Sequence, residues 1–203
     1  MPKDGRITHE RILAAAKEEF LDKGFEDSSI RAIAKKAGVT SAALYRHFGS
    51  KHDIFAALVE PGLEAIDAWT TDHKARAYID AENGRADQAA TRSEVDMMRE
   101  VVFPNRSMFK LLVNCSRGTA YEQFIHNLVE RQQADLSQGI GWLKEKGFKV
   151  NDIGEGALHM MMSAYTTALF EPIAHDYPEE DTMRYYRTMK RFFLPGWRDL
   201  LGI

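Results

Sequence analysis

The stretch RAIAKKAGVTSAALYRHFGSK, residues 31–51, decides how the chain is organised. It contains a short apolar-periodic helix, a glycine and a second short helix in quick succession. This order is typical of a helix-turn-helix DNA reader. The window 28–52 also has five Lys or Arg residues and no Asp or Glu, although the formal net charge of the chain is −3. A local cationic surface on an acidic protein indicates a polyanionic partner.

Capping residues predict where the helices of this window begin and end. The first helix has an apolar stripe at helical spacing, formed by Ile30, Ile33, Ala34 and Ala37. Ser28 or Ser29 is available as its N-cap, and Gly38 is expected to end it in a left-handed C-cap. Thr40 is expected to cap the second helix, with Leu44 on its buried side. A further helix start is predicted at Ser50.

At these residues the chain resembles the tetracycline-repressor (TetR) family of bacterial transcriptional regulators. The family pattern appears as ERILAAAKEEFLDKGF at 10–25, RAIAKKAGV at 31–39 and LYRHF at 44–48, followed by Lys51. The resemblance covers roughly residues 6–58. It implies an all-α fold, with an N-terminal three-helix helix-turn-helix DNA-binding domain followed by a larger helical ligand-binding and dimerisation domain.

The charge distribution agrees with a division into a DNA-binding domain at 1–52 and a helical effector-binding and dimerisation domain at 53–203. The first segment has a net charge of +3 and the second a net charge of −6. In the second segment Pro61 predicts a kink or break, and residues 81–93 read as a surface connection. Further helices are expected at 94–103, 104–114, 120–146, 152–170 and 178–201.

The resemblance implies DNA contacts from eight residues: Ser29, Thr40, Ser41, Ala42, Tyr45, Arg46, His47 and Lys51. The recognition helix offers small side chains and no Asn or Gln, and Arg46 is its one long forked donor. We therefore hypothesise modest base readout that relies on thymine methyl groups and DNA shape. Lys3 and Arg6 form either a minor-groove arm or a disordered tail.

Methionine and aromatic residues of the second domain form either an adaptable ligand cavity or ordinary core. The set is Trp69, Met97, Met98, Phe103, Met108, Phe109, Leu112, Phe124, Trp142, Met160, Met161 and Tyr165. Members of the TetR family commonly bind a small effector between the helices of this domain and then release DNA. The resemblance therefore implies a small-molecule effector, whose identity does not follow from these residues.

The last two helices are the expected dimer interface. Small residues on the helix after Asp152 allow close approach, and the final helix has a large apolar stripe with Pro195 inside it. The candidate interface is Gly156, Ala157, Ala164, Ala168, Met189, Phe193, Trp197 and Leu200. Such a stripe is more often intrachain core, but the resemblance implies a homodimer through these helices. A two-fold dimer would bind a palindromic operator with half-sites about 34–36 Å apart or a multiple of that.

The sequence provides no sign of catalysis, a cofactor or a metal. It lacks GxSxG, Walker and dinucleotide motifs. Glu155 and His159 are more simply a polar pair than metal ligands, and Cys115 is more simply a buried hydrophobe than a redox sensor. Alternatives are an activator, a regulator controlled by a protein partner, and a helical small-molecule-binding or metal-dependent enzyme with a vestigial reader.

The predicted location is the cytoplasm, at the bacterial nucleoid, with no membrane segment. The longest uncharged apolar-leaning run, residues 156–170, is too short for a simple bilayer span and includes a histidine. The single cysteine also suits a reducing compartment.

Overall fold

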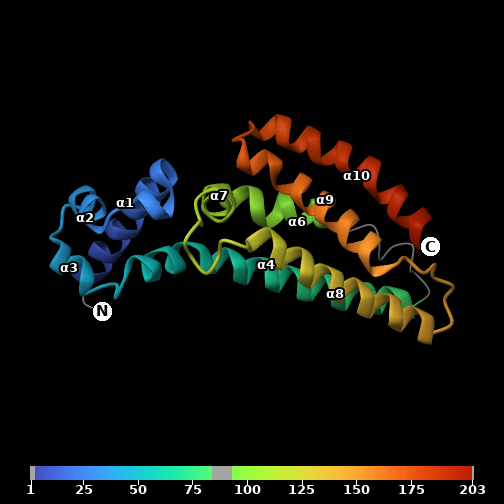
Figure 1. Cartoon of the computed structure of the whole chain (residues 1–203). Helices are drawn as coiled ribbons and strands as arrows, with labels where there is room; N and C mark the ends of the chain where they lie inside the picture. Colours follow the sequence, from blue (N-terminus) through green and yellow to red (C-terminus); the bar gives the residue numbers. More distant parts are fainter. Residues whose placement is uncertain (1–2, 84–92, 203) are drawn as a thin grey trace. The chain divides into compact units, whose positions relative to one another are not determined.

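A computed structural model describes residues 3–83 and 93–202, and their regular structure is entirely helical (Figure 1). This confirms the all-α prediction. The elements are α1 Lys3–Asp27, α2 Ile30–Ala37, α3 Ser41–Tyr45, α4 Lys51–Glu82, α6 Glu94–Met97, the π-helical turn η1 Met98–Val102, the 3₁₀ turn η2 Phe103–Asn105, α7 Arg106–Asn114, α8 Phe124–Glu145, α9 Glu155–Ala174 and α10 Glu179–Leu201.

The chain forms two compact units. The first, which we call the N-terminal unit, comprises Met1–Asp67 and Asn105–Glu122. The second, the C-terminal unit, comprises Ala68–Pro104 and Gln123–Ile203. Helix α4 begins in one unit and ends in the other. The functional division at residue 52 stays a prediction.

Aromatic packing forms the core of the N-terminal unit. Phe20 and Phe55 are fully buried and meet edge to face, with ring centroids 5.3 Å apart. Phe25 packs on Phe55 at 5.4 Å, and its N–H donates to the carbonyl oxygen of Cys115 at 2.9 Å. The segment that follows α7 is therefore bound to the end of α1.

Of the kink or break predicted at Pro61, the break is wrong, because α4 remains helical from Lys51 to Glu82. A proline inside a helix removes one backbone hydrogen bond, and tertiary packing can offset that cost. Here the next residue, Gly62, lies directly against α7. A Cβ on Gly62 would lie 2.0 Å from Met108 Cε and 3.2 Å from Phe109 Cζ. The Pro-Gly pair thus marks a close helix contact rather than a helix end.

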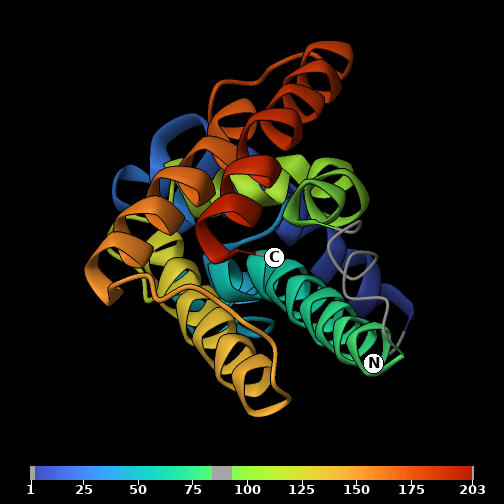
Figure 2. The same ribbon diagram turned by 90° about the vertical axis from the view of Figure 1, so that its right-hand side faces the viewer.

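In the C-terminal unit α8 and α9 run side by side (Figures 1 and 2), and α10 packs on α9. Phe124 of α8 meets Phe170 of α9 edge to face at 5.4 Å. Tyr186 of α10 is 1% exposed, and its hydroxyl donates to the carbonyl oxygen of Leu169 at 3.1 Å. Burial raises the pKa of the Tyr186 hydroxyl above its ordinary value.

Most of the predicted helices of this region are present, with different ends. The helix expected at 94–103 is divided into α6, η1 and the start of η2. The predicted α10 continues through Pro195. Residues 84–92 of the predicted surface connection and the Lys3 side chain lie outside what the structure describes. None of the described helices combines the length and apolar character that a bilayer crossing requires.

Candidate functional site

Gly38 makes the turn between α2 and α3, as predicted. It has φ 65° and ψ 37°, and its N–H points to the carbonyl oxygens of Ala34 and Lys35. A Cβ there would lie 2.5 Å from the Arg11 guanidinium, which donates to the carbonyl oxygen of Ala37. The left-handed backbone conformation therefore favours glycine at this position, and a Cβ would also require the Arg11 side chain to move.

Hydroxyl caps start the helices on either side of this turn. Ser29 Oγ accepts from the N–H of Ala32 at 3.2 Å, and Thr40 Oγ1 accepts from the N–H of Ala43 at 3.1 Å. Ser50 Oγ accepts a bond of 3.1 Å at the start of α4. These bonds satisfy amide groups that a helix leaves unpaired in its first turn. The predicted caps at Ser29, Thr40 and Ser50 are confirmed.

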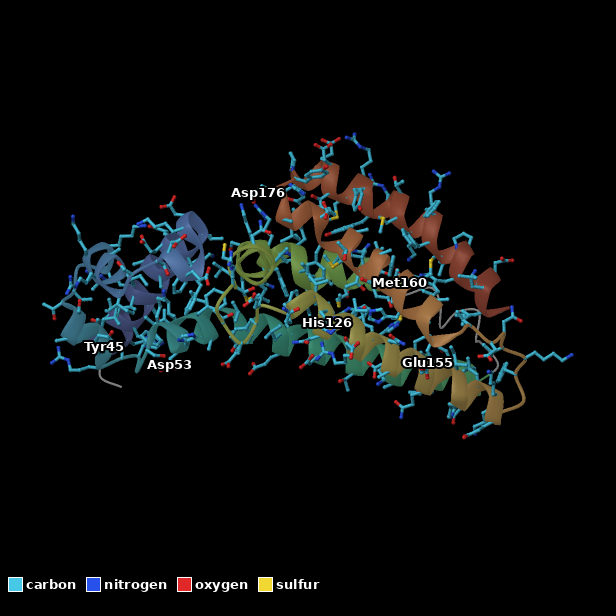
Figure 3. All side chains as sticks on the ribbon, viewed as in Figure 1. Tyr45, Asp53, His126, Glu155, Met160 and Asp176 are labelled. Carbon is cyan, nitrogen blue, oxygen red and sulfur yellow. The ribbon has the colours of Figure 1, made fainter. Side chains whose placement is uncertain are left out.

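Helix α3 is anchored on one side and open on the other. Leu44 is fully buried and Phe48 is 6% exposed, so they fix the helix on the unit. On the opposite side Tyr45 is 53% exposed, and Figure 3 shows it at the outer edge of the N-terminal unit. Arg46 follows it and is also exposed. The helix therefore exposes a phenol and a guanidinium at the surface.

The eight residues predicted to contact DNA differ in exposure. Ser29, Thr40, Ala42, Tyr45 and Arg46 are exposed, whereas Ser41, His47 and Lys51 are partly buried. The hydroxyls that cap α2 and α3 accept hydrogen bonds and keep their O–H for donation to a phosphate oxygen. The DNA contacts themselves stay predictions.

Three of the five cations in residues 28–52 remain available at the surface. Arg31, Lys35 and Arg46 are exposed and have no ion-pair partner in the part of the chain that the structure describes. By contrast, Lys36 pairs with the Glu19 carboxylate at 2.9 Å. Glu19 is 1% exposed and also accepts from Lys23 at 2.8 Å. Hydrogen bonds from Lys23 and Lys36 hold the pKa of Glu19 below its ordinary value.

Lys51 has an internal role that the sequence did not predict. Its Nζ donates to the carbonyl oxygens of Phe25 at 2.7 Å, Ser28 at 2.9 Å and Glu26 at 3.3 Å. The same ammonium lies 4.3 Å from the centre of the Phe25 ring. Burial lowers the pKa of Lys51. A contact from Lys51 to a phosphate would therefore compete with bonds that already hold the turn between α1 and α2.

A pair of histidines lies behind the recognition helix. The ring of His9 stacks on Phe48 with centroids 4.5 Å apart and lies 6.0 Å from the ring of His47. The buried Nδ1 atoms of both histidines have no hydrogen-bond partner among residues 3–83 and 93–202. His47, predicted to contact DNA, therefore has only its other ring nitrogen available for that contact.

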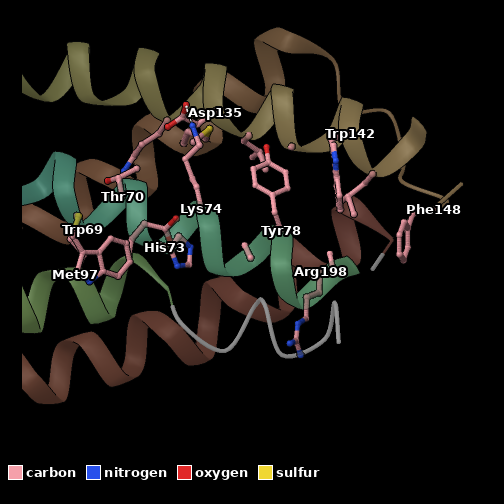
Figure 4. Close-up of a pocket in the computed structure, with 18 of the residues that line it drawn as sticks. Trp69, Thr70, His73, Lys74, Tyr78, Met97, Asp135, Trp142, Phe148 and Arg198 are labelled. Atoms are coloured by element: carbon pink, nitrogen blue, oxygen red, sulfur yellow. Dashed lines mark hydrogen bonds and ion pairs between the residues drawn. The ribbon is translucent and has the colours of Figure 1, made fainter. Parts of the chain in front are cut away.

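The C-terminal unit contains a cavity of about 620 Å³ (Figure 4). Helices α4 and α8 supply most of its wall, with two residues from α6 and single residues from α9 and α10. Its aromatic and charged lining residues are Trp69, His73, Tyr78, Trp142, Phe148, Lys74, Glu94, Asp135, Lys149 and Arg198. The size is within the range of pockets that enclose drug-sized ligands.

The predicted pocket residues divide into three groups. Trp69, Met97 and Trp142 line the cavity. Met160 and Met161 are 71% and 40% exposed on α9, so the structure does not bring them to it. The others lie in cores or against neighbouring helices away from the cavity lining: Met98, Phe103, Met108, Phe109, Leu112, Phe124 and Tyr165.

The predicted dimer residues are also divided. Met189 is 7% exposed, Phe193 lies on Tyr165 at 4.8 Å, and Trp197 packs on the buried cluster around Leu158. These three large side chains therefore have intrachain contacts, and their part in a dimer stays a prediction. Gly156, Ala157, Ala164 and Leu200 are exposed and Ala168 is partly buried.

An exposed apolar stripe runs along α9 and continues with an exposed residue of α10. Two of its residues, Met160 and Met161, were predicted to line the ligand pocket. Met160 and Met161 continue the exposed Ala157 and Ala164 at helical spacing. Figure 3 labels Met160 on α9, where its side chain is 71% exposed. On α10 Phe192 is 74% exposed.

Sequence reasoning also missed much of the cavity wall. His73, Lys74 and Tyr78 follow Trp69 at spacings of four, five and nine on α4. At about 100° per residue these positions spread over roughly half the circumference of α4, so a single helical stripe starting at Trp69 could not have indicated them. Asp135 and Arg198 come from distant helices, and nothing local in the sequence links them to α4.

The residues considered for a metal have other partners. His159 Nδ1 lies 3.0 Å from Gln133 Oε1 of α8, so its closest polar partner is Gln133 rather than Glu155. No group of three metal-ligating side chains occurs within the described ranges. Cys115 is 5% exposed, and burial raises the pKa of its thiol. A raised pKa disfavours the reactive thiolate.

Residues 12–58 match the family model for bacterial regulatory proteins of the tetR family. Over 52 residues the chain is 46% identical to the HTH-type transcriptional repressor BepR of Brucella suis, covering 26% of this chain and 25% of BepR. Over 83 residues it is 32% identical to the HTH-type transcriptional activator FasR of Mycolicibacterium smegmatis, covering 37% of each. The matches thus span well under half of these relatives, all of which are transcriptional regulators.

The fold as a whole is similar to that of NalD, the secondary repressor of the MexAB-OprM multidrug efflux pump in Pseudomonas aeruginosa. The TM-score is 0.57 at 21% identity, and the match covers 98% of both chains. The relatives are regulators rather than enzymes, in agreement with the absence of catalytic motifs from the sequence.

Proposed function

We propose that this protein is a DNA-binding transcriptional repressor that works as a homodimer in the cytoplasm, because residues 12–58 match the family model for bacterial regulatory proteins of the tetR family. It binds a palindromic operator and is released by a small-molecule effector.

The observation that carries this proposal is the exposed face of α3 with its neighbouring cations. Tyr45 and Arg46 project from a helix that Leu44 anchors from behind. Arg31 and Lys35 add two exposed positive charges on α2. Cations and hydroxyls of this kind bind the phosphate backbone and set the register of a recognition helix on the duplex.

The chemistry of α3 favours limited direct reading of bases. Thr40, Ser41 and Ala42 present hydroxyls and a methyl group at the start of the helix. Methyl contacts suit thymine, and the one forked donor, Arg46, suits guanine or phosphate. The operator is therefore expected to be defined partly by DNA shape.

The exposed apolar stripe of α9 and α10 supports a homodimer. Met160 and Phe192 are 71% and 74% exposed, which is unusual for large apolar side chains at a surface without a partner. We assign the stripe to a second copy of this chain. A two-fold dimer presents two recognition helices, which accounts for a palindromic operator.

The cavity supports control by a small molecule. Helix α4 supplies Trp69, His73 and Tyr78 to its wall, and the same helix begins at Lys51 in the N-terminal unit. An effector releases DNA if it binds more tightly to the conformation that does not bind the operator. Helix α4 is continuous from Lys51 to the cavity wall. The operator DNA and the effector can therefore each favour a different position of this one helix.

The direction of regulation is a separate point, because the similar proteins include the repressor BepR and the activator FasR. We favour repression. A promoter reporter carrying the selected operator distinguishes the two: deletion of the gene raises expression for a repressor and lowers it for an activator.

The primary test is selection of genomic DNA fragments by the purified full-length protein at two salt concentrations. A palindromic motif that persists at the higher salt is expected, because nonspecific phosphate binding weakens steeply with salt. Arg46→Ala should lose the motif, whereas Lys144→Ala, an exposed cation on α8, should retain it. Salt-sensitive binding without a motif would contradict the proposal.

A further inference from the structure

The cavity has an aromatic interior. The ring of Trp69 stacks on His73 with centroids 4.8 Å apart, and Tyr78 meets Trp142 edge to face at 4.9 Å. Figure 4 shows Tyr78 and Trp142 toward one end of the cavity and Trp69 and His73 toward the other. Aromatic rings bind planar apolar groups through stacked and edge-on contacts. The walls therefore suit a flat aromatic body.

The basic and acidic side chains in the middle of the cavity already have partners. Lys74 Nζ lies 2.7 Å from Asp135 Oδ1, and each of these side chains is only about a third exposed. Arg198 also has an interaction of its own within the protein. These three charges are therefore not free to pair with a ligand.

The two other charges of the lining have opposite signs. Glu94 is partly buried and accepts from the Tyr165 hydroxyl at 3.4 Å. Lys149 is exposed, so water solvates its ammonium group. Removing a charged group from water is costly unless an opposite charge pairs with it. Because the lining offers no excess of either sign for such a pair, it favours an uncharged ligand.

The polar atoms of the aromatic residues differ between the two ends of the cavity. At one end Trp69 Nε1 donates to Glu100 Oε2 at 3.1 Å. At the other end neither the Tyr78 hydroxyl nor Trp142 Nε1 has a hydrogen-bond partner within the part of the chain that the structure describes. Both side chains are partly buried, and the polar atoms of buried tyrosine and tryptophan usually have a partner. The cavity therefore has two available donors on adjacent rings.

We infer that the cavity binds a flat, uncharged aromatic molecule with an acceptor oxygen such as a carbonyl. The oxygen accepts from the Tyr78 hydroxyl or Trp142 Nε1, and the rings lie toward Trp69. A few placed polar groups in a mainly apolar pocket are what orients a small ligand. This inference rests on the proposed function and names the class of its effector.

The test measures equilibrium dialysis of four small aromatic probes against the full-length protein in the absence of DNA. β-Acetylnaphthalene has a carbonyl acceptor, and β-ethylnaphthalene has a methylene group in its place. β-Naphthoate is the matched anion, and methylquinolinium is a flat cation of similar size. β-Acetylnaphthalene should bind more tightly than either charged probe.

The two donors are tested by removing each one. Tyr78→Phe and Trp142→Phe should each lower the affinity for β-acetylnaphthalene, relative to that for β-ethylnaphthalene, about threefold to tenfold, as expected for one hydrogen bond. The ratio is measured on one variant at a time, so a change in cavity shape affects both probes. Tyr177→Phe removes a hydroxyl from an exposed tyrosine outside the cavity lining and should leave the ratio unchanged. Either donor variant is sufficient if the other unfolds.

The place of binding is tested on α8. Gly139→Leu should fill the cavity and abolish binding of β-acetylnaphthalene. Gly141→Leu on the same helix should not, because only Gly139 lines the cavity. This pair also separates binding in the cavity from binding on the exposed apolar stripe.

An unchanged affinity ratio in the donor variants would overturn the role of the acceptor oxygen. Tighter binding of β-naphthoate or methylquinolinium than of β-acetylnaphthalene would overturn the uncharged class, and binding that survives Gly139→Leu would overturn the site. Operator binding is measured separately by anisotropy. Failure of the dialysis results with an intact operator removes only this inference, and loss of the operator with intact probe binding removes only the proposed regulator.

Discussion

The Lys51 ammonium lies 2.7 Å from the carbonyl oxygen of Phe25 and is shared with two further carbonyl groups of the same turn. A side chain that family resemblance assigns to DNA thus also closes the end of α1. Lys51→Met should lower the free energy of unfolding by about 1.5–3 kcal/mol, the usual range for bonds to a charged donor. Urea unfolding of the purified protein measures this.

The DNA role of Lys51 is tested on the same variant under conditions in which it is folded. A phosphate contact predicts that the slope of log affinity against log salt falls by about one unit per protomer. Lys35→Met is the control, because Lys35 is exposed and should change the slope without a large loss of stability. A lower stability with an unchanged salt slope would leave Lys51 a purely structural residue.

Substitution of two glycines by alanine should have opposite effects. Gly38→Ala places a Cβ at φ 65° and against Arg11, and should destabilise by about 1–2 kcal/mol. Gly141→Ala adds a Cβ in open space within α8 and should stabilise by about 0.5–1 kcal/mol. Thermal unfolding of both variants provides the comparison. A Gly38→Ala variant that is more stable than the wild type would contradict the geometry described for Gly38.

Glu19 should make the stability of the protein depend on pH in the acid range. Its pKa is lowered in the folded protein from the ordinary value of 4.5. Its contribution is therefore complete above about pH 4.5 and is lost as the pH falls through the lower folded value. Glu19→Gln should be less stable than the wild type at neutral pH, and the difference should shrink below pH 4.5. Unfolding curves across this range test it, with the exposed Glu18→Gln as control.

The exposed apolar stripe predicts the assembly state. Met160→Glu and Phe192→Glu should each shift the protein from dimer to monomer, because a buried carboxylate without a partner is costly at an interface. Sedimentation or light scattering measures the mass. Gln138→Glu adds the same charge on an exposed position of α8 and should leave the dimer intact. A wild-type monomer at micromolar concentration would refute the assignment.

Local signals in the sequence were sufficient for the helix-turn-helix. Gly38 and the caps Ser29 and Thr40 act on neighbouring backbone groups, so residue type and position alone predicted them. Leu44 was also predicted to be buried, because α3 is too short to present more than one apolar side.

The C-terminal unit was less predictable because its helices have apolar residues on several faces. Met189 and Trp197 were expected at the dimer interface and have intrachain contacts, whereas Met160 was expected in the cavity and is exposed. Helical periodicity shows which residues share a face but not what that face contacts. The contact of Asn151 with the end of α10 is a tertiary one, which no local pattern reveals.

The attachment of Cys115 to Phe25 also has a consequence for how the protein is made. The N-terminal unit is discontinuous, since residues 105–122 complete the packing begun by residues 1–67. A chain emerging from the ribosome therefore holds the recognition helix before it holds all of the unit's core. Full stability of this unit must await release of about 120 residues. A gene fragment ending after residue 67 would encode the DNA-contacting residues but not the segment that bonds to the end of α1.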